Sequence, residues 1–75
     1  MLTTTERTEL VQHYADYWEL SLVYVQPWHL RLSHTDGRRL DYFPKSGRAT
    51  WVSTNRWFRI EDIEQFLLEH FKQVV

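Results

Sequence analysis

The chain has no cysteine, only two glycines and two prolines in 75 residues, and no long apolar run. Without cysteine, neither a disulfide nor a cysteine-based zinc site can stabilise the fold. The longest apolar run covers residues 22–25, whereas a membrane span needs roughly 20 residues. The first residues lack the basic start and apolar stretch of a signal peptide. We therefore expect one cytoplasmic domain over residues 1–75, without membrane contact.

Aromatic residues are abundant, with four Trp, four Tyr and four Phe. A domain this short buries only about 60% of the surface that its unfolded chain exposes, so its core must be dense. Each large ring can bury about 150–250 Å². We expect the rings that point inward among Trp28, Tyr42, Phe43 and Trp51 to fill the core.

The hydrophobic pattern changes its period along the chain and predicts an α+β fold. Apolar residues at three- and four-residue spacing indicate a helix over residues 4–17, opened by a capping box between Thr3 and Glu6. Alternation then predicts strands over residues 28–34, 39–43 and 48–53, with Asp36-Gly37 in the first turn. Residues 60–74 return to helical spacing.

The segment 18–25 suits either a further strand or a continuation of the first helix, and Pro27 ends it in both cases. The short connections favour an antiparallel meander. The predicted architecture is α-β-β-β-α, with three or four strands. Two helices should cover one face of the sheet and leave the other face partly open.

Charge is segregated although the formal net charge is only −1. Residues 1–30 carry one cation and four carboxylates, which gives −3, and residues 60–75 have the same balance. Residues 31–59 carry seven cations and two carboxylates, which gives +5. Six of these cations are Arg, which binds phosphates and carboxylates through a planar fork and stacks on rings. The pattern favours an acidic partner, unless the cations only pair with the protein's own carboxylates.

Strand alternation selects candidate contacts within this basic stretch. If Leu30 and Leu32 face the helices together with Trp28, then His29, Arg31, Arg39 and Phe43 point outward. Other cations lie at turns or strand ends. The predicted partner-binding residues are Arg31, Arg38, Arg39, Phe43, Lys45, Arg48 and Arg56, with Phe43 as an apolar anchor among charged donors.

The residue pattern does not indicate catalysis, a metal site or a cofactor. His29 and His34 would point to opposite faces of one strand, so they cannot readily share an ion. The serines lie at turns or strand ends without a glycine-flanked elbow. Both glycines serve turns, which leaves no phosphate-binding fingerprint. We expect a non-enzymatic protein for which a small-molecule ligand is disfavoured.

The order of elements is similar to that of the double-stranded-RNA-binding domain, a family with a lysine cluster at the start of its last helix. Here Glu61, Asp62 and Glu64 occupy that region, so this function is not carried over. Residues 28–71 also resemble small phage- or prophage-type proteins of unknown function. The resemblance rests on Gly37-Arg38-Arg39-Leu40-Asp41-Tyr42-Phe43-Pro44, preceded by Trp28-His29-Leu30-Arg31-Leu32 and followed by Trp51 and Ile60-Glu61-Asp62-Ile63.

That resemblance implies a compact protein that binds a host factor or nucleic acid, in some cases to block a defence system, and it supplies no catalytic residue. Three partner classes therefore stay open. The first is an acidic protein surface, and the second is nucleic acid bound directly by the same residues. The third is a second copy of the chain, with acidic helices against basic sheets.

Overall fold

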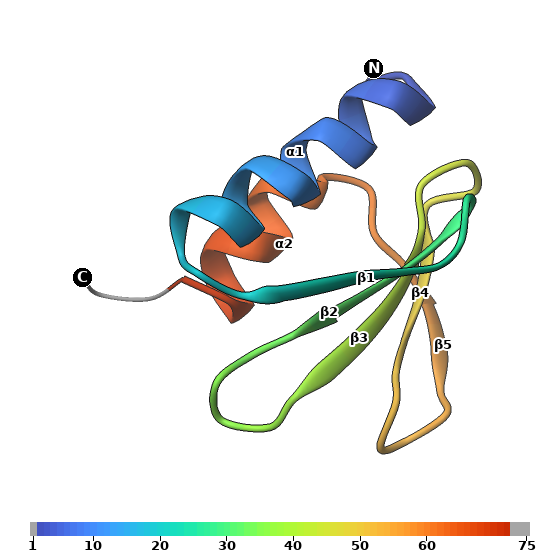
Figure 1. Cartoon of the computed structure of the whole chain (residues 1–75). Helices are drawn as coiled ribbons and strands as arrows, with labels where there is room; N and C mark the ends of the chain where they lie inside the picture. The colour runs from blue at the N-terminus through green and yellow to red at the C-terminus, as the bar shows by residue number, and fades with distance from the viewer. Residues whose placement is uncertain (1, 73–75) are drawn as a thin grey trace.

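The computed structural model describes residues 2–72, which form two helices and one five-stranded antiparallel sheet (Figure 1). The strands pair in sequence order, so the predicted α+β fold with a meander is confirmed. Neither helix is long and apolar enough to cross a membrane. In chain order the elements are α1 (Thr4–Tyr17), β1 (Ser21–Gln26), β2 (His29–Ser33), β3 (Arg39–Phe43), β4 (Arg48–Trp51), β5 (Trp57–Arg59) and α2 (Ile63–His70).

The first helix begins and ends as local chemistry dictates. The Thr3 backbone N–H donates to the Glu6 carboxylate at 3.0 Å, and the Glu6 N–H donates to the Thr3 hydroxyl at 3.1 Å, which completes the predicted capping box. Trp18 is the C-cap, and Glu19 adopts a positive φ of 56°. This left-handed residue ends the helix and turns the chain into β1, so the ambiguous 18–25 segment is mainly strand.

The sheet has one strand more than the sequence predicted. The segment from Trp57 to Arg59 pairs with β4 and forms β5, which its three residues made hard to detect. The predicted strands 28–34 and 48–53 are also shorter in the structure. The last helix starts at Ile63, because the Asp62 side chain caps it by accepting a hydrogen bond from the Gln65 N–H at 3.1 Å. Val74 of the predicted helix lies outside the described residues.

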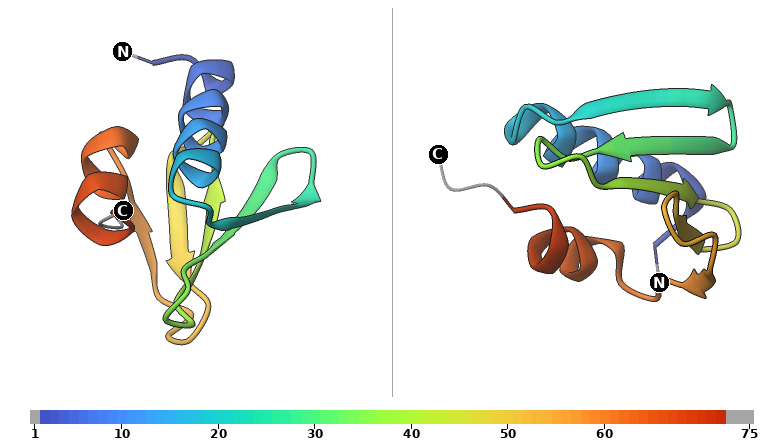
Figure 2. Two further views of the ribbon diagram at one scale, coloured as in Figure 1. Left: turned by 60° about the vertical axis from the view of Figure 1, so that its left-hand side comes forward. Right: turned by 90° about the horizontal axis from the view of Figure 1, so that it is seen from below.

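The core lies between the helices and one face of the sheet. Register aligns Leu30, Tyr42 and Ala49 in one cross-strand row, and Leu32, Leu40 and Trp51 in another. The helices contribute the buried residues Val11, Ala15, Ile63 and Leu67, with Phe71 directly after α2. Figure 2 shows both helices packed on this face while the opposite face carries no helix.

One aromatic residue that was expected to face the helices, Trp28, lies elsewhere. Tyr42 is fully buried and Trp51 packs against the core, as predicted. Trp28, by contrast, is exposed in the turn between β1 and β2, because this hairpin extends beyond the helices (Figure 2). Phe43 is half-buried on the opposite face of the sheet, as the strand alternation predicted. The helix-facing orientation predicted for Trp28 was therefore wrong.

Candidate binding face of the sheet

The sheet surface opposite the helices, called here the open face, carries two cross-strand rows of side chains. Register places Val23, Arg31, Asp41, Thr50 and Trp57 side by side in the first row. The second row contains Phe43, Arg48 and Arg59, with the His29 ring against Phe43. Outward alternation on β2 and β3 thus agrees with the sequence analysis.

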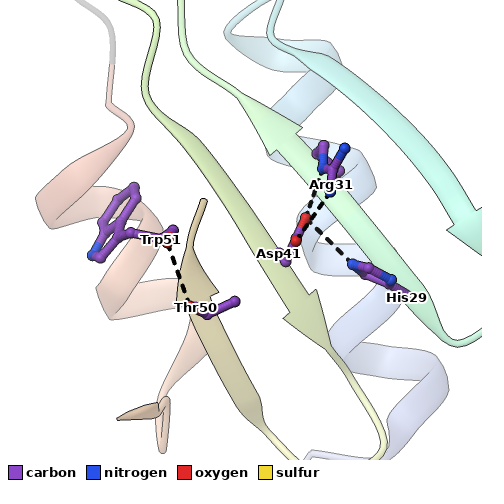
Figure 3. A network of polar contacts seen from close by, with 5 residues as sticks. All are labelled: His29, Arg31, Asp41, Thr50 and Trp51. Carbon is purple, nitrogen blue, oxygen red and sulfur yellow. Dashed lines mark hydrogen bonds and ion pairs between the residues drawn. The ribbon is translucent and has the colours of Figure 1, made fainter. Parts of the chain in front are cut away.

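Asp41 lies at the centre of the open face and is held by two residues of β2 (Figure 3). Arg31 donates to it from Nε at 2.8 Å and from Nη2 at 3.2 Å. His29 Nε2 lies 3.3 Å from the same carboxylate. Burial alone would raise the pKa of Asp41, but the contacts with Arg31 and His29 outweigh it and hold this pKa below its ordinary value.

The Arg31–Asp41 ion pair bears on the predicted partner contacts, because an arginine that already binds a carboxylate of its own chain is less available to a partner. The carboxylate raises the pKa of Arg31 through its hydrogen bonds. Asp41 in turn presents little uncompensated negative charge on the open face. Arg31 is therefore better described as the residue that neutralises Asp41 than as a free donor for a partner.

Three rings form a continuous ledge across the open face. The Phe43 ring stacks on His29 with centroids 4.4 Å apart, and its centroid lies 5.4 Å from that of Trp57. Trp57 is 60% exposed although it sits in a strand. Because most of the Trp57 side chain is not covered by the rest of the chain, it offers a large apolar surface to a partner. We call His29, Phe43 and Trp57 the ring ledge.

Two arginines face each other directly beside the ring ledge. Arg48 on β4 and Arg59 on β5 are register partners, and both are exposed. Among the described residues, neither has a carboxylate within ion-pair distance. Like charges directly opposite on a sheet are destabilising, by about 0.2–1 kcal/mol at the scale of cross-strand pairs. An acidic group bound between them would remove this repulsion.

The remaining predicted contacts are divided between the two ends of the sheet. Arg39 opens β3 on the open face opposite Ser33. Lys45 lies in the β3–β4 turn, two residues after Phe43 and three before Arg48, whereas Arg56 lies in the β4–β5 turn at the other end of the sheet (Figure 1).

Arg38 is directed away from the open face. Its Nε donates to Asp36 at 2.8 Å, and its guanidinium lies 5.7 Å from the centroid of the core ring Phe71. The structure thus brings Phe43 and Arg48 together as register partners, with Arg39 on the same face and Lys45 in the turn between β3 and β4, and does not bring Arg38 to them.

Sequence reasoning missed Trp57 and Arg59 as members of this site. The side chains of Trp57-Phe58-Arg59 alternate between the two faces of the sheet. Phe58 points inward opposite Ala49, and Trp57 and Arg59 point outward. That alternation was the available signal, but a segment of three residues is too short to separate a strand from a loop.

The helix side carries the opposite charge. The N-terminal ends of α1 and α2 line a groove of about 760 Å³, whose walls include five carboxylates. These belong to Glu6, Glu9, Glu61, Asp62 and Glu64. Within residues 2–72, His, Asp and Glu form no group of three or more that could hold a metal ion. These carboxylates of the helix side thus lie on the opposite side of the fold from Arg39, Arg48 and Arg59, whereas Arg38 is an exception among the cations.

The open face thus combines the ring ledge, the neutralised carboxylate of Asp41, and two facing arginines that have no ion-pair partner among the described residues. No protein-family model matches this chain, and comparisons with curated proteins and with solved structures also find no match.

Proposed function

We propose that this protein is a non-enzymatic binding module whose open face docks onto an acidic protein surface. The observation that carries the proposal is that Arg48 and Arg59, beside the exposed Trp57 ring, face each other with no carboxylate at ion-pair distance in the part of the chain that the structure describes. Trp and Arg are the residue types that most often dominate protein–protein binding energy. Here the ring supplies the apolar anchor, and the arginines select carboxylates.

The arrangement also removes the main obstacle to an acidic partner, which is Asp41. Its charge is compensated by Arg31 within the sheet, so it does not repel approaching carboxylates. Arg39 extends the basic surface along the same face. Because residues 28–71 resemble phage-type proteins, we propose that the acidic surface belongs to a host protein.

The whole chain favours a protein over a long nucleic acid. Its net charge is −1, and its helix side is lined with carboxylates. A polyanion that extends beyond the open face would meet these carboxylates, whereas a compact acidic patch would meet only the arginines. A partner surface of limited area therefore fits the charge distribution best.

Direct binding of single-stranded nucleic acid is the second candidate, and the ring ledge favours it. Bases stack on exposed aromatic residues while neighbouring cations bind the backbone. Trp57 and Phe43 lie beside Arg48 and Arg59 in an arrangement of this kind. The two candidates share their residues and differ in how binding responds to salt and nuclease.

Arg59→Glu separates loss of binding from loss of folding. It places a carboxylate opposite Arg48, so stability should stay the same or rise by up to about 1 kcal/mol. Lys72→Glu, beyond the end of α2, is the matched control because it makes the same charge change on the other side of the fold. In affinity capture from host lysate treated with nuclease, one protein should be retained by the wild type and Lys72→Glu and lost by Arg59→Glu.

Loss of capture by Lys72→Glu as well would contradict docking through the open face, because net charge alone would then explain binding. The nucleic-acid candidate is tested by fluorescence anisotropy with labelled mixed-sequence single strands. If Arg39, Arg48 and Arg59 each neutralise one phosphate, affinity should fall about 20-fold between about 50 and 200 mM salt. Such a response, with capture abolished by nuclease, would replace the protein partner by nucleic acid.

A further inference from the structure

The two edges of the sheet differ in how they are protected against pairing with another strand. At one edge, β5 is only three residues long, contains Arg59 and follows Arg56. Short length and charge are the usual means by which sheets prevent edge-to-edge association. The β5 edge is therefore protected.

The β1 edge has six residues and no charge. Its sequence is Ser-Leu-Val-Tyr-Val-Gln, and the uncharged stretch runs over residues 20–28. Val23, Tyr24 and Val25 are 42–51% exposed. A register shift between Tyr24 and Gln26 forms a bulge near the tip, which leaves the pairing from Ser21 to Tyr24 regular. Figure 2 shows the β1–β2 hairpin projecting from the body of the domain. From α1, Gln12 accepts a hydrogen bond from the Tyr24 hydroxyl at 3.3 Å, and Tyr24 remains 46% exposed.

We propose that two copies of this chain associate through antiparallel pairing of their β1 strands. An edge strand presents unpaired N–H and C=O groups, and another extended strand satisfies them. With Val23 opposite Val23 of the second copy, Leu22 lies opposite Tyr24 twice, and each pair stays on one face of the sheet. All three pairs are apolar, which stabilises cross-strand contact, and neither strand brings a charge. A second copy is thus the complementary occupant of this edge.

The symmetry has a consequence for the open face. Antiparallel pairing of identical edges requires a twofold axis perpendicular to the sheet, so both open faces lie on the same side of a ten-stranded sheet. The two Arg48–Arg59 pairs would then point in one direction. The pairing uses none of these residues and goes beyond the proposed function, so it can be tested without any partner.

Sedimentation equilibrium over low micromolar to near-millimolar protein tests the pairing. The apparent mass of the wild type should rise from 9.2 kDa toward twice that value. Val23→Lys should weaken dimerisation at least about tenfold, because symmetry brings two lysines opposite each other. Leu68→Lys, a partly exposed apolar residue of α2, is the matched control and should dimerise as the wild type does. Circular dichroism establishes that each variant is folded.

Amide hydrogen exchange of the wild type provides a readout that needs no substitution. Protection of β1 should rise with protein concentration, while β5 amides should not respond. A wild type that stays monomeric throughout would overturn the proposal, as would equal dimerisation by Val23→Lys or equal loss by Leu68→Lys. If β1 gains protection only when the captured partner is present, a partner strand occupies this edge and self-pairing is wrong.

Discussion

Replacing Trp51 by Ala should remove much of the stability of this domain. The Trp51 ring lies on the helix side of β4 and packs against the core. Its centroid lies 5.7 Å from that of Phe71, 5.9 Å from those of Phe66 and His70, and 6.4 Å from that of Phe58. Truncation would leave a cavity among these rings, because they are held by β5 and α2 and can collapse only partly.

The size of the effect follows from the burial of the ring. Replacement of a buried Trp or Phe by Ala costs about 3–5 kcal/mol, and because Trp51 is partly exposed we expect a cost of about 3 kcal/mol. At about 0.05–0.15 kcal/mol per residue, a domain of this length has only about 4–11 kcal/mol of total stability. The melting temperature should therefore fall by about 12–24 °C.

Trp57→Ala is the matched control, because Trp57 lies on β5 with its side chain on the open face. It should cost less than about 1 kcal/mol while reducing partner binding. Urea unfolding followed by far-ultraviolet circular dichroism measures both variants without relying on tryptophan fluorescence. A loss below about 1 kcal/mol for Trp51→Ala, or equal losses for the two variants, would refute the assignment of one Trp to the core and the other to the surface.

Two further predictions concern the polar network and the turns. Asp41→Asn should lower the free energy of unfolding at neutral pH by only about 1 kcal/mol, because the Arg31 side chain is 38% exposed to screening solvent. The pKa of Asp41 is lowered in the folded state, so the stability difference between wild type and Asp41→Asn should be present above about pH 4 and disappear as pH falls through the folded pKa. A stability difference at about pH 2.5 equal to that at neutral pH would contradict the ion pair. Gly47→Ala should cost at least about 1 kcal/mol more than Gly37→Ala, because both residues have positive φ but only at Gly47 would a Cβ lie 3.2 Å from the Ile60 carbonyl oxygen. Thermal melts of both alanine variants measure the difference, and equal costs would show that the turn relaxes around the added methyl group.

The helix over residues 4–17 and the strand over residues 39–43 were predicted with the boundaries found in the structure. Both rest on local signals, namely the capping box at Thr3 and the Asp36-Gly37 turn. The fifth strand could not be predicted in the same way. Its three residues are held in place by pairing with β4, which is a tertiary contact and leaves almost no periodicity in the sequence.

The candidate site shows the same division. Alternation correctly placed Phe43 and Arg39 on the open face. It could not predict that Trp28 lies in an exposed turn, because the exposure depends on how far the helices reach over the β1–β2 hairpin. It also could not predict that Trp57 joins Phe43 in the ring ledge, since that contact requires β5.

By itself, the sequence determined the fold class and the separation of basic strands from acidic helices, because period, caps and charge are properties of neighbouring residues. The tertiary structure alone decided which cations remain unpaired. Register set Arg31 against Asp41 and so neutralised it, while it set Arg48 against Arg59, and within residues 2–72 neither of these two has a carboxylate at ion-pair distance. Electrostatic pairing depends on distances across strands, and those distances exist only once the chain has folded.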